Sequence, residues 1–259
     1  MDFLQHFTTM SDAFSLAFAR VSGFIAFAPI LGARTLPALV KAMMAFLLAS
    51  VVAPGVQPLV RPEYLGNQWV WVILLEASIG AAIGLAASFV FEVVAFAGNL
   101  IDYQVGFGFI NVVDPLFGTN VSILSFFYSL LASIVFLLVN AHHILIETVY
   151  RSYELLPIAG FQMSSFSLEL LVRETSNIFD LGFRLAAPIT LIMVILDFSF
   201  GMLGKTVPQF QILVIGFPLK VGFGLVALGL ALKPATQFMM NLFAHYREQL
   251  FWILKSWGG

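Results

Sequence analysis

The chain alternates long apolar runs with short connectors, and this pattern predicts membrane helices. Six apolar runs can be delimited, at residues 13–31, 39–60, 69–101, 121–147, 178–198 and 209–232. A helix that spans a bilayer needs about 20 apolar residues, at about 1.5 Å per residue. The third run is too long for one simple span, so it must tilt, break or project from the bilayer. The fourth is the cleanest candidate, because no Asp, Glu, Lys or Arg occurs between Asp114 and Glu147.

The composition of the 259 residues also indicates a lipid environment. Hydrophobic residues make up 60% of the chain and charged residues 10%, and the mean hydropathy is +0.98. Ordinary soluble domains have roughly 45–50% apolar and about 25% charged residues. Too little polar surface remains to cover a water-soluble domain, which excludes a soluble enzyme. A net charge of -2 excludes a nucleic-acid partner, which requires a basic face. Because backbone polar groups in lipid must pair within their own segment, we expect an all-α membrane protein.

Eight ionisable residues interrupt the apolar runs, namely Arg20, Glu76, Glu92, Asp102, Arg184, Asp197, Lys205 and Lys220. A charge at the bilayer centre costs about 2.5–3.5 kcal/mol on insertion scales, so these groups cannot all face lipid. Asp102 and Lys205 lie near the ends of runs, and we expect them to reach the membrane interface. Buried pairing is expected for Arg20, Glu76, Glu92, Arg184 and Lys220. Pairs between subunits are favoured over a proton relay, because the carboxylates are scattered along the chain.

Small residues in the third run predict a close helix contact. Gly80 and Gly84 share a helix face, and such a small-xxx-small pattern lets another helix approach closely. The approaching helix can come from the same chain or from another subunit. Glu76 and Glu92 end about 160° apart around a straight helix, so they do not form a paired-carboxylate active site.

The connector after the third run is apolar where a solvent-exposed loop would be polar. It reads GFGFINVVDP from Gly106 to Pro115, and no Lys or Arg occurs from Ile101 to Tyr150. Apolar non-helical chain at membrane depth is tolerated only inside protein or lining a cavity. The segment is therefore either a re-entrant loop buried as ordinary core or a hydrophobic gate that excludes water and ions. The gating side chains would be Phe107, Phe109, Ile110, Val112 and Val113.

Catalytic motifs are absent from the sequence. It contains no nucleophile elbow, P-loop, dinucleotide fingerprint or HExxH motif. His143 and Glu147 are four residues apart and offer two metal ligands at most, so we expect no metal and no cofactor. A secondary transporter is an alternative, with a coupling site formed by Glu76, Glu92, Arg184 and Lys220. A membrane enzyme acting on lipid is a third interpretation, disfavoured because no catalytic constellation occurs.

A series of short stretches, in order along nearly the whole chain, resembles the FliR family. They are Ala19–Gly23 with Pro29, Gly32, Arg34 and Pro37; Gly106–Phe109 and Val113–Pro115; Phe136–Leu137 and Asn140–His143; Ser152 and Pro157; and Pro208–Gln209 with Gly216–Lys220. The family, called SctT in virulence systems, comprises membrane subunits of the type III protein export gate. The flagellar branch is favoured by general similarity.

The resemblance implies a two-part fold and a hetero-oligomeric assembly. A FliP-like helical part, residues 1–165, would be fused to a FliQ-like helical hairpin and tail, residues 166–259. The chain would pack with FliP and FliQ subunits in the bacterial inner membrane at the flagellar basal body, raised toward the periplasm. FlhB would wrap the cytoplasmic entrance, and FlhA would lie below it.

The resemblance also implies a role for the apolar connector. A loop at about 103–120 would plug the central pore, through the side chains and backbone of Gly106, Phe107, Gly108, Phe109, Ile110, Val112 and Val113. The chain would then be a non-enzymatic subunit that nucleates the gate and keeps it closed until unfolded protein substrates pass. Membrane lipid would be its other contact.

Overall fold

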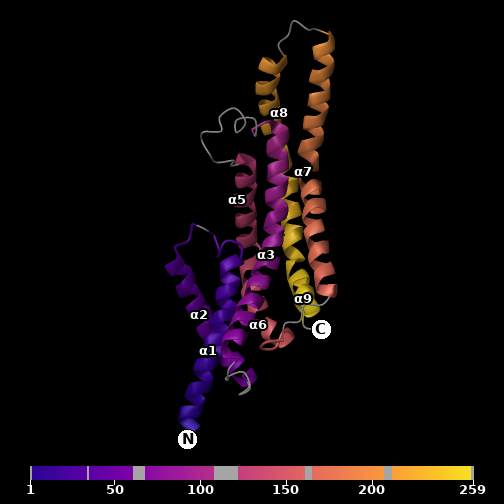
Figure 1. The fold of residues 1–259 in the computed structure, drawn as a ribbon. Coiled ribbons are helices and arrows are strands. Elements are labelled where there is room, and N and C mark those ends of the chain that lie inside the picture. Colours follow the sequence, from indigo (N-terminus) through magenta and orange to yellow (C-terminus); the bar gives the residue numbers. More distant parts are fainter. Residues whose placement is uncertain are drawn as a thin grey trace. The chain divides into compact units, whose positions relative to one another are not determined.

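The computed structural model describes residues 2–33, 35–60, 68–107, 122–160, 165–206 and 212–257, and these form helices joined by turns (Figure 1). The helices are α1 (Asp2–Phe27), α2 (Ala38–Val56), the 3₁₀ turn η1 (Gln57–Leu59), α3 (Trp69–Val105), α5 (Ile123–Leu138), α6 (Ala141–Leu155), α7 (Ser165–Thr206), α8 (Ile212–Ala244) and α9 (Tyr246–Trp257). The described part of the chain contains no strand, which confirms the all-α expectation.

The third apolar run forms a single continuous helix. The 37 residues of α3 extend for about 55 Å at 1.5 Å per residue, against a hydrocarbon core of about 30 Å. The predicted excess of length is therefore confirmed, and α3 contains no proline that would bend it. Within the described residues, five segments are long and apolar enough to cross a membrane, including Thr9–Phe27, Ala38–Leu59 and Trp69–Val105.

The fourth run is not the single clean span that its composition predicts. It is divided into α5 and α6, with a break between Leu138 and Ala141. Asn140 lies at the break with φ +55°, in the left-handed region that asparagine adopts more readily than most residues. The start of α5 is capped, because the Ser122 hydroxyl accepts a 3.0 Å hydrogen bond from the Ser125 N–H. Hydropathy does not detect such a break, because both halves are apolar.

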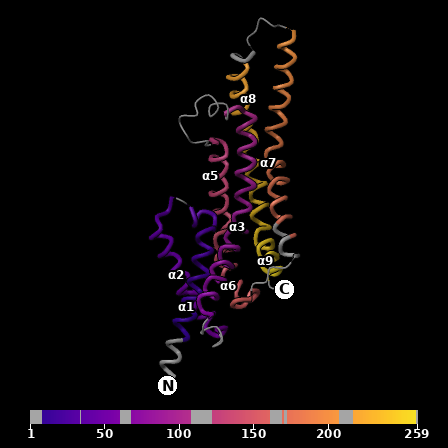
Figure 2. Tube along the Cα trace, in the orientation of Figure 1, coloured from indigo at the N-terminus to yellow at the C-terminus, as the bar shows by residue number. Residues whose placement is uncertain are grey.

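The chain folds into two compact units. The first contains the described residues of 1–89, 140–173 and 245–259, which include α1, α2, the first half of α3, α6 and α9. The second contains 90–139 and 174–244, which include the rest of α3, α5, most of α7 and α8. In the second unit, α7 and α8 lie side by side (Figure 2), joined by an ion pair between Asp197 and Lys220 at 2.8 Å.

The core of the first unit depends on close contact between α1 and α3. Gly80 packs against the backbone of Arg20, Gly84 against that of Phe24, and Gly23 against that of Ala77. A Cβ added at Gly84 would lie 2.6 Å from the carbonyl oxygen of Phe24, closer than atoms can pack. The predicted small-residue face is therefore occupied by a helix of the same chain.

Aromatic rings fill the core of the second unit. Phe91, Phe136 and Phe243 contact one another with ring centroids 5.5–5.6 Å apart. Phe96 packs in edge contacts on Phe179 and Phe183 of α7. Such geometries add about 0.5–1.5 kcal/mol per pair beyond area burial. These contacts join α3, α5, α7 and α8 into one unit.

Candidate functional site

A fully buried ion pair lies at the centre of the first unit. Arg20 of α1 and Glu76 of α3 are both inaccessible to solvent. The Arg20 Nε donates to Glu76 Oε2 at 2.7 Å, and its Nη2 donates to Oε1 at 3.1 Å. This two-pronged geometry matches the planar guanidinium to the carboxylate and is the strongest form of such a pair. Two of the residues for which buried pairing was predicted are therefore brought together within one chain.

The same guanidinium also holds the end of α6. Arg20 Nη1 donates to the Ser152 hydroxyl at 2.9 Å, and Nη2 donates to the carbonyl oxygen of Leu156 at 3.1 Å. Its carbon lies 3.7 Å from the centre of the Tyr153 ring, so the cation also rests on an aromatic face. A positive charge beside the last carbonyls of a helix is favourable, because it compensates the negative end of the helix dipole.

The carboxylate of Glu76 in turn fixes the turn after α6. Glu76 Oε1 accepts a 3.1 Å hydrogen bond from the Ala159 N–H, and Ala159 has φ +58°. An alanine in this left-handed conformation is strained, and such strain persists only where surrounding contacts hold it. The Arg20–Glu76 pair therefore connects α1, α3, α6 and the turn at 156–160 through one charge-assisted network.

The two ends of the apolar connector are joined by a side chain in the second unit. Asp102, in the last turns of α3, accepts a 3.1 Å hydrogen bond from the Leu124 N–H at the start of α5. The Ser125 hydroxyl donates to the Ala95 carbonyl oxygen of α3 at 2.9 Å. The sequence-based expectation that Asp102 reaches the membrane interface is wrong, because its side chain is buried. A carboxylate at a helix start is stabilised by the free N–H groups there.

The first residues of the connector leave α3 in a distinctive conformation. Gly106 has φ +100°, and a Cβ there would lie 3.2 Å from the Phe217 ring of α8. Glycine is suited to this position, since it carries no side chain to clash. Phe107 is half-buried. The other predicted plug residues, Gly108, Phe109, Ile110, Val112 and Val113, lie outside the described residues.

The remaining charges predicted to be buried in pairs are placed differently. Glu92 is exposed and forms no ion pair with any residue that the structure describes. Arg184 pairs with Asp180 one turn away on α7 at 2.9 Å, and both side chains are more than half exposed. Lys220 pairs with Asp197 across the α7–α8 hairpin. Within this chain, only Arg20 and Glu76 form a buried pair among the described residues.

Several members of the buried network were not identified from the sequence. In the sequence analysis, Ser152 appears only as part of the family resemblance. No sequence pattern marks Tyr153, Leu156 or Ala159 as members of the network. Two of the four contacts use backbone atoms, which any residue supplies, so residue type does not reveal them. The charges of Arg20 and Glu76 within apolar runs were the indication that such a network exists.

Comparison with known proteins identifies the family of this chain. Residues 12–246 match the family described as "Bacterial export proteins, family 1". This chain belongs to that family. It is 33% identical over 232 residues to the flagellar biosynthetic protein FliR of Escherichia coli (strain K12), covering 90% of this chain and 85% of that protein. FliR of Pectobacterium carotovorum is 31% identical over 237 residues, covering 92% and 90%. FliR of Bacillus subtilis (strain 168) is 29% identical over 238 residues, covering 90% of each.

Family membership gives the apolar helices a biological setting. The chain is a membrane component of the flagellar export apparatus, and the FliR resemblance stated from its motifs is confirmed. The match includes both compact units, since it begins in α1 and ends in α9. The buried network and the anchored connector are therefore features of an export protein.

Proposed function

We propose that this chain is a non-enzymatic core subunit of the flagellar protein export gate. In this proposal it nucleates a channel with FliP-type and FliQ-type subunits and closes the pore until unfolded substrates pass. The observation that carries the proposal is the apolar connector between α3 and α5. Its segment 106–113 contains no charged residue, and its ends are tied together by Asp102 and Leu124.

A tethered apolar connector suits a gate for physical reasons. A constriction lined by phenylalanine, isoleucine and valine disfavours water, and ions cannot cross it without losing hydration. The hydrogen bond between Asp102 and Leu124 supports this function, because it holds the two ends of the connector close together. Glycines at 106 and 108 allow tight changes of direction.

The two-part organisation is proposed on the same basis. Residues 1–165 would form the FliP-like part, and 166–259 the FliQ-like hairpin and tail. The antiparallel α7 and α8, joined by the Asp197–Lys220 pair, support the hairpin. Large apolar side chains remain exposed on this hairpin, among them Leu191, Phe198 and Leu230, as expected of helices that contact lipid or neighbouring subunits.

The assembly would lie in the bacterial inner membrane, raised toward the periplasm, with FlhB-type and FlhA-type subunits at the cytoplasmic side. Exposed apolar helices that exceed the bilayer thickness, such as α3, fit an assembly in which protein neighbours cover part of the surface. Purification in mild detergent followed by mass spectrometry tests this arrangement. We expect two apolar proteins of different mass to co-purify with the chain. Recovery of the chain alone, as a monomer or homodimer, would contradict the proposed assembly.

Deletion of residues 107–112 tests the gate itself. We expect a leak of small ions through the inner membrane, because the apolar barrier is lost. The complex should still assemble, because the deletion leaves the helices unchanged. Phe107→Ser, with unchanged chain length, should give a weaker leak. Phe126→Ser makes the same chemical change at an exposed position of α5 and serves as the matched control. Unchanged ion permeability in the deletion variant, with the complex purified intact, would refute the plug.

The transporter alternative finds no support in the placement of its charges. Glu76 is engaged by Arg20, Arg184 by Asp180 and Lys220 by Asp197. A coupling site requires these groups to converge on a shared substrate or ion. Solute flux by the purified chain alone in liposomes would favour that alternative over the gate.

A further inference from the structure

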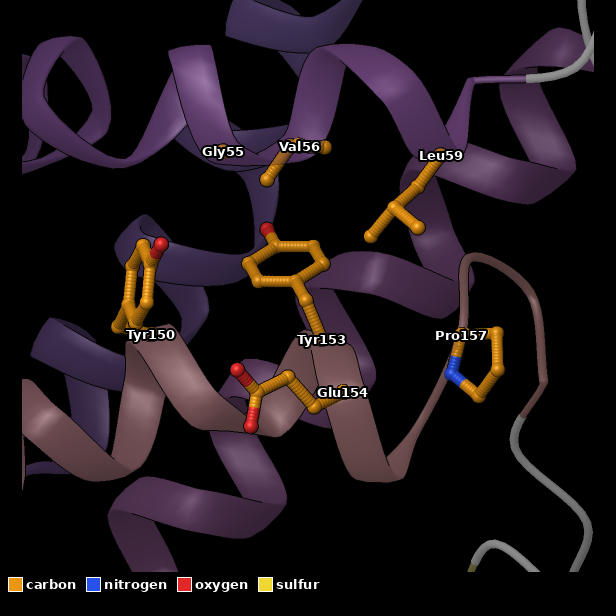
Figure 3. A pocket seen from close by; sticks show the side chains of 7 residues that line it. All are labelled: Gly55, Val56, Leu59, Tyr150, Tyr153, Glu154 and Pro157. Carbon is orange, nitrogen blue, oxygen red and sulfur yellow. The ribbon is translucent and has the colours of Figure 1, made fainter.

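A cavity of about 290 Å³ lies beside the buried network in the first unit (Figure 3). It is lined by Gly55, Val56, Leu59, Tyr150, Tyr153, Glu154 and Pro157. Most of this lining is apolar, and the side-chain polar groups all come from α6: two phenol hydroxyls and one carboxylate. The volume is at the lower end of the range for small-molecule sites, about 300–1,000 Å³. It therefore suits a headgroup-sized ligand.

The Tyr153 side chain is fixed in the wall of this cavity with its hydroxyl unpaired. The residue is only 4% exposed, and one ring face is held by the Arg20 guanidinium. Its hydroxyl makes no hydrogen bond with any residue in the described part of the chain. Figure 3 shows the side chain reaching from α6 toward Gly55 and Val56 of α2. An unsatisfied buried hydroxyl is costly, so a ligand atom that hydrogen-bonds to Tyr153 would be favoured.

The carboxylate of Glu154 determines the charge that the ligand should carry. Glu154 is exposed at the edge of the cavity and forms no ion pair within the described ranges. Its carboxylate turns toward the two tyrosine side chains in Figure 3. A carboxylate there disfavours a purely anionic ligand and favours one with an ammonium group beside its hydrogen-bond acceptor.

The position of the cavity indicates where such a ligand comes from. It lies at the C-terminal end of the candidate membrane span Ala38–Leu59. Along this span, the side chains of Leu39, Met43, Phe46, Leu47 and Val51 are exposed, and they lead toward the cavity at the end of the helix. Tyrosines are enriched at the level of lipid headgroups, because the ring is apolar and the hydroxyl is polar. An apolar helix face that ends at a tyrosine-lined cavity therefore matches a lipid with its headgroup in the cavity.

We propose that this cavity binds the headgroup of a phospholipid that carries a primary ammonium group, of the phosphatidylethanolamine type. The phosphate oxygens accept hydrogen bonds from the hydroxyls of Tyr153 and Tyr150, and the ammonium pairs with Glu154. The acyl chains follow the exposed apolar face of α2. A bound lipid of this kind would hold the Tyr153 ring in place against the Arg20 guanidinium. It would thereby connect the lipid to the buried network through Tyr153.

Native mass spectrometry of the full chain, purified with its co-purifying partners, tests this assignment. The sample is exchanged into equal amounts of phosphatidylethanolamine, phosphatidylcholine and phosphatidylglycerol. We expect preferential retention of phosphatidylethanolamine, because phosphatidylcholine lacks ammonium hydrogens and phosphatidylglycerol lacks the ammonium. Tyr153→Phe and Glu154→Gln should each reduce this retention by about tenfold. Tyr103→Phe makes the same chemical change at an exposed tyrosine outside the cavity and should retain the lipid.

Several results would overturn the assignment. Equal retention of the three lipids, or unchanged retention in both Tyr153→Phe and Glu154→Gln, would exclude the ammonium-selective site. Displacement of the lipid by soluble phosphoethanolamine at equal concentration would assign the cavity to a soluble ligand. If the variants keep the lipid but lose a co-purifying protein, a partner side chain occupies the cavity instead. Glu154 is exposed, so its variant reports on binding even where Tyr153→Phe disturbs folding.

Discussion

Removal of either partner of the Arg20–Glu76 pair should destabilise the first unit strongly. Arg20→Met deletes four hydrogen bonds, two to Glu76 and one each to Ser152 and Leu156. Among the described residues, the carboxylate of Glu76 then keeps the Ala159 N–H as its one remaining hydrogen-bond donor while staying fully buried. Leaving one charge of a buried pair uncompensated costs about 3–5 kcal/mol. Glu76→Gln, which preserves shape, leaves the guanidinium uncompensated and should cost a similar amount.

The double variant distinguishes a charge effect from a packing effect. Arg20→Met combined with Glu76→Leu removes both charges and refills the space with apolar atoms. Replacement of a whole buried ion pair is often neutral or stabilising, so we expect the double variant to be more stable than either single variant. The coupling free energy between the two changes should then exceed about 2 kcal/mol. This lies in the upper part of the range of about 0.5–3 kcal/mol that is typical of residues in one network.

Reversible unfolding of the full chain in mixed detergent micelles, followed by circular dichroism, measures these free energies. Arg184→Met is the matched control, because its partner Asp180 lies one turn away and both side chains are more than half exposed. Such surface pairs contribute about 0.3–0.5 kcal/mol. The reasoning fails if Arg20→Met costs no more than Arg184→Met, or if the two single changes add to give the double variant.

Three further predictions concern helix packing, the connector and a partly exposed ion pair. Gly80→Ala should destabilise the chain by several kcal/mol in the same unfolding assay, because its methyl group would overlap the Arg20 carbonyl. At Gly229, an added Cβ would meet no neighbouring element of the described chain within 4 Å, so Gly229→Ala should instead stabilise by about 0.5–1 kcal/mol. If the connector closes the pore as proposed, Asp102→Ala should increase ion leak across the inner membrane, because the connector loses its hydrogen bond to Leu124. Asp102→Asn retains an acceptor and should leak less, and equal leak in the two variants would contradict this role of Asp102. Lys220→Met should lower the free energy of unfolding by less than about 1 kcal/mol, because the Asp197–Lys220 pair is partly exposed. The difference should shrink at high salt. A larger loss that does not depend on salt would contradict this.

Sequence patterns predicted the helical class and the family correctly because both depend on local or ordered features. Apolar runs of sufficient length form helices in lipid whatever their neighbours are. The excess length of the third run was likewise a matter of counting residues. The order of short motifs, from Ala19–Gly23 to Gly216–Lys220, was enough for the FliR resemblance, which the match over residues 12–246 confirms.

The break of the fourth run and the location of Asp102 were not predictable in this way. Asn140 adopts a left-handed conformation between two apolar halves, and hydropathy averages across it. Asp102 lies near the end of an apolar run, which favours the interface, but Leu124 is close enough in space to donate a hydrogen bond to it. The location of each residue depends on how two helices meet, and no local pattern records that.

By itself, the sequence determined that this protein is a helical membrane chain of the export family, with an apolar connector between two of its runs. Only the tertiary structure decided that Arg20 pairs with Glu76, 56 residues away, and that the same cation holds the end of α6. The physical reason is that burial of apolar segments is driven by their own composition. The partner of a buried charge, in contrast, is whichever group the packing brings within hydrogen-bond distance, and backbone atoms serve as well as side chains.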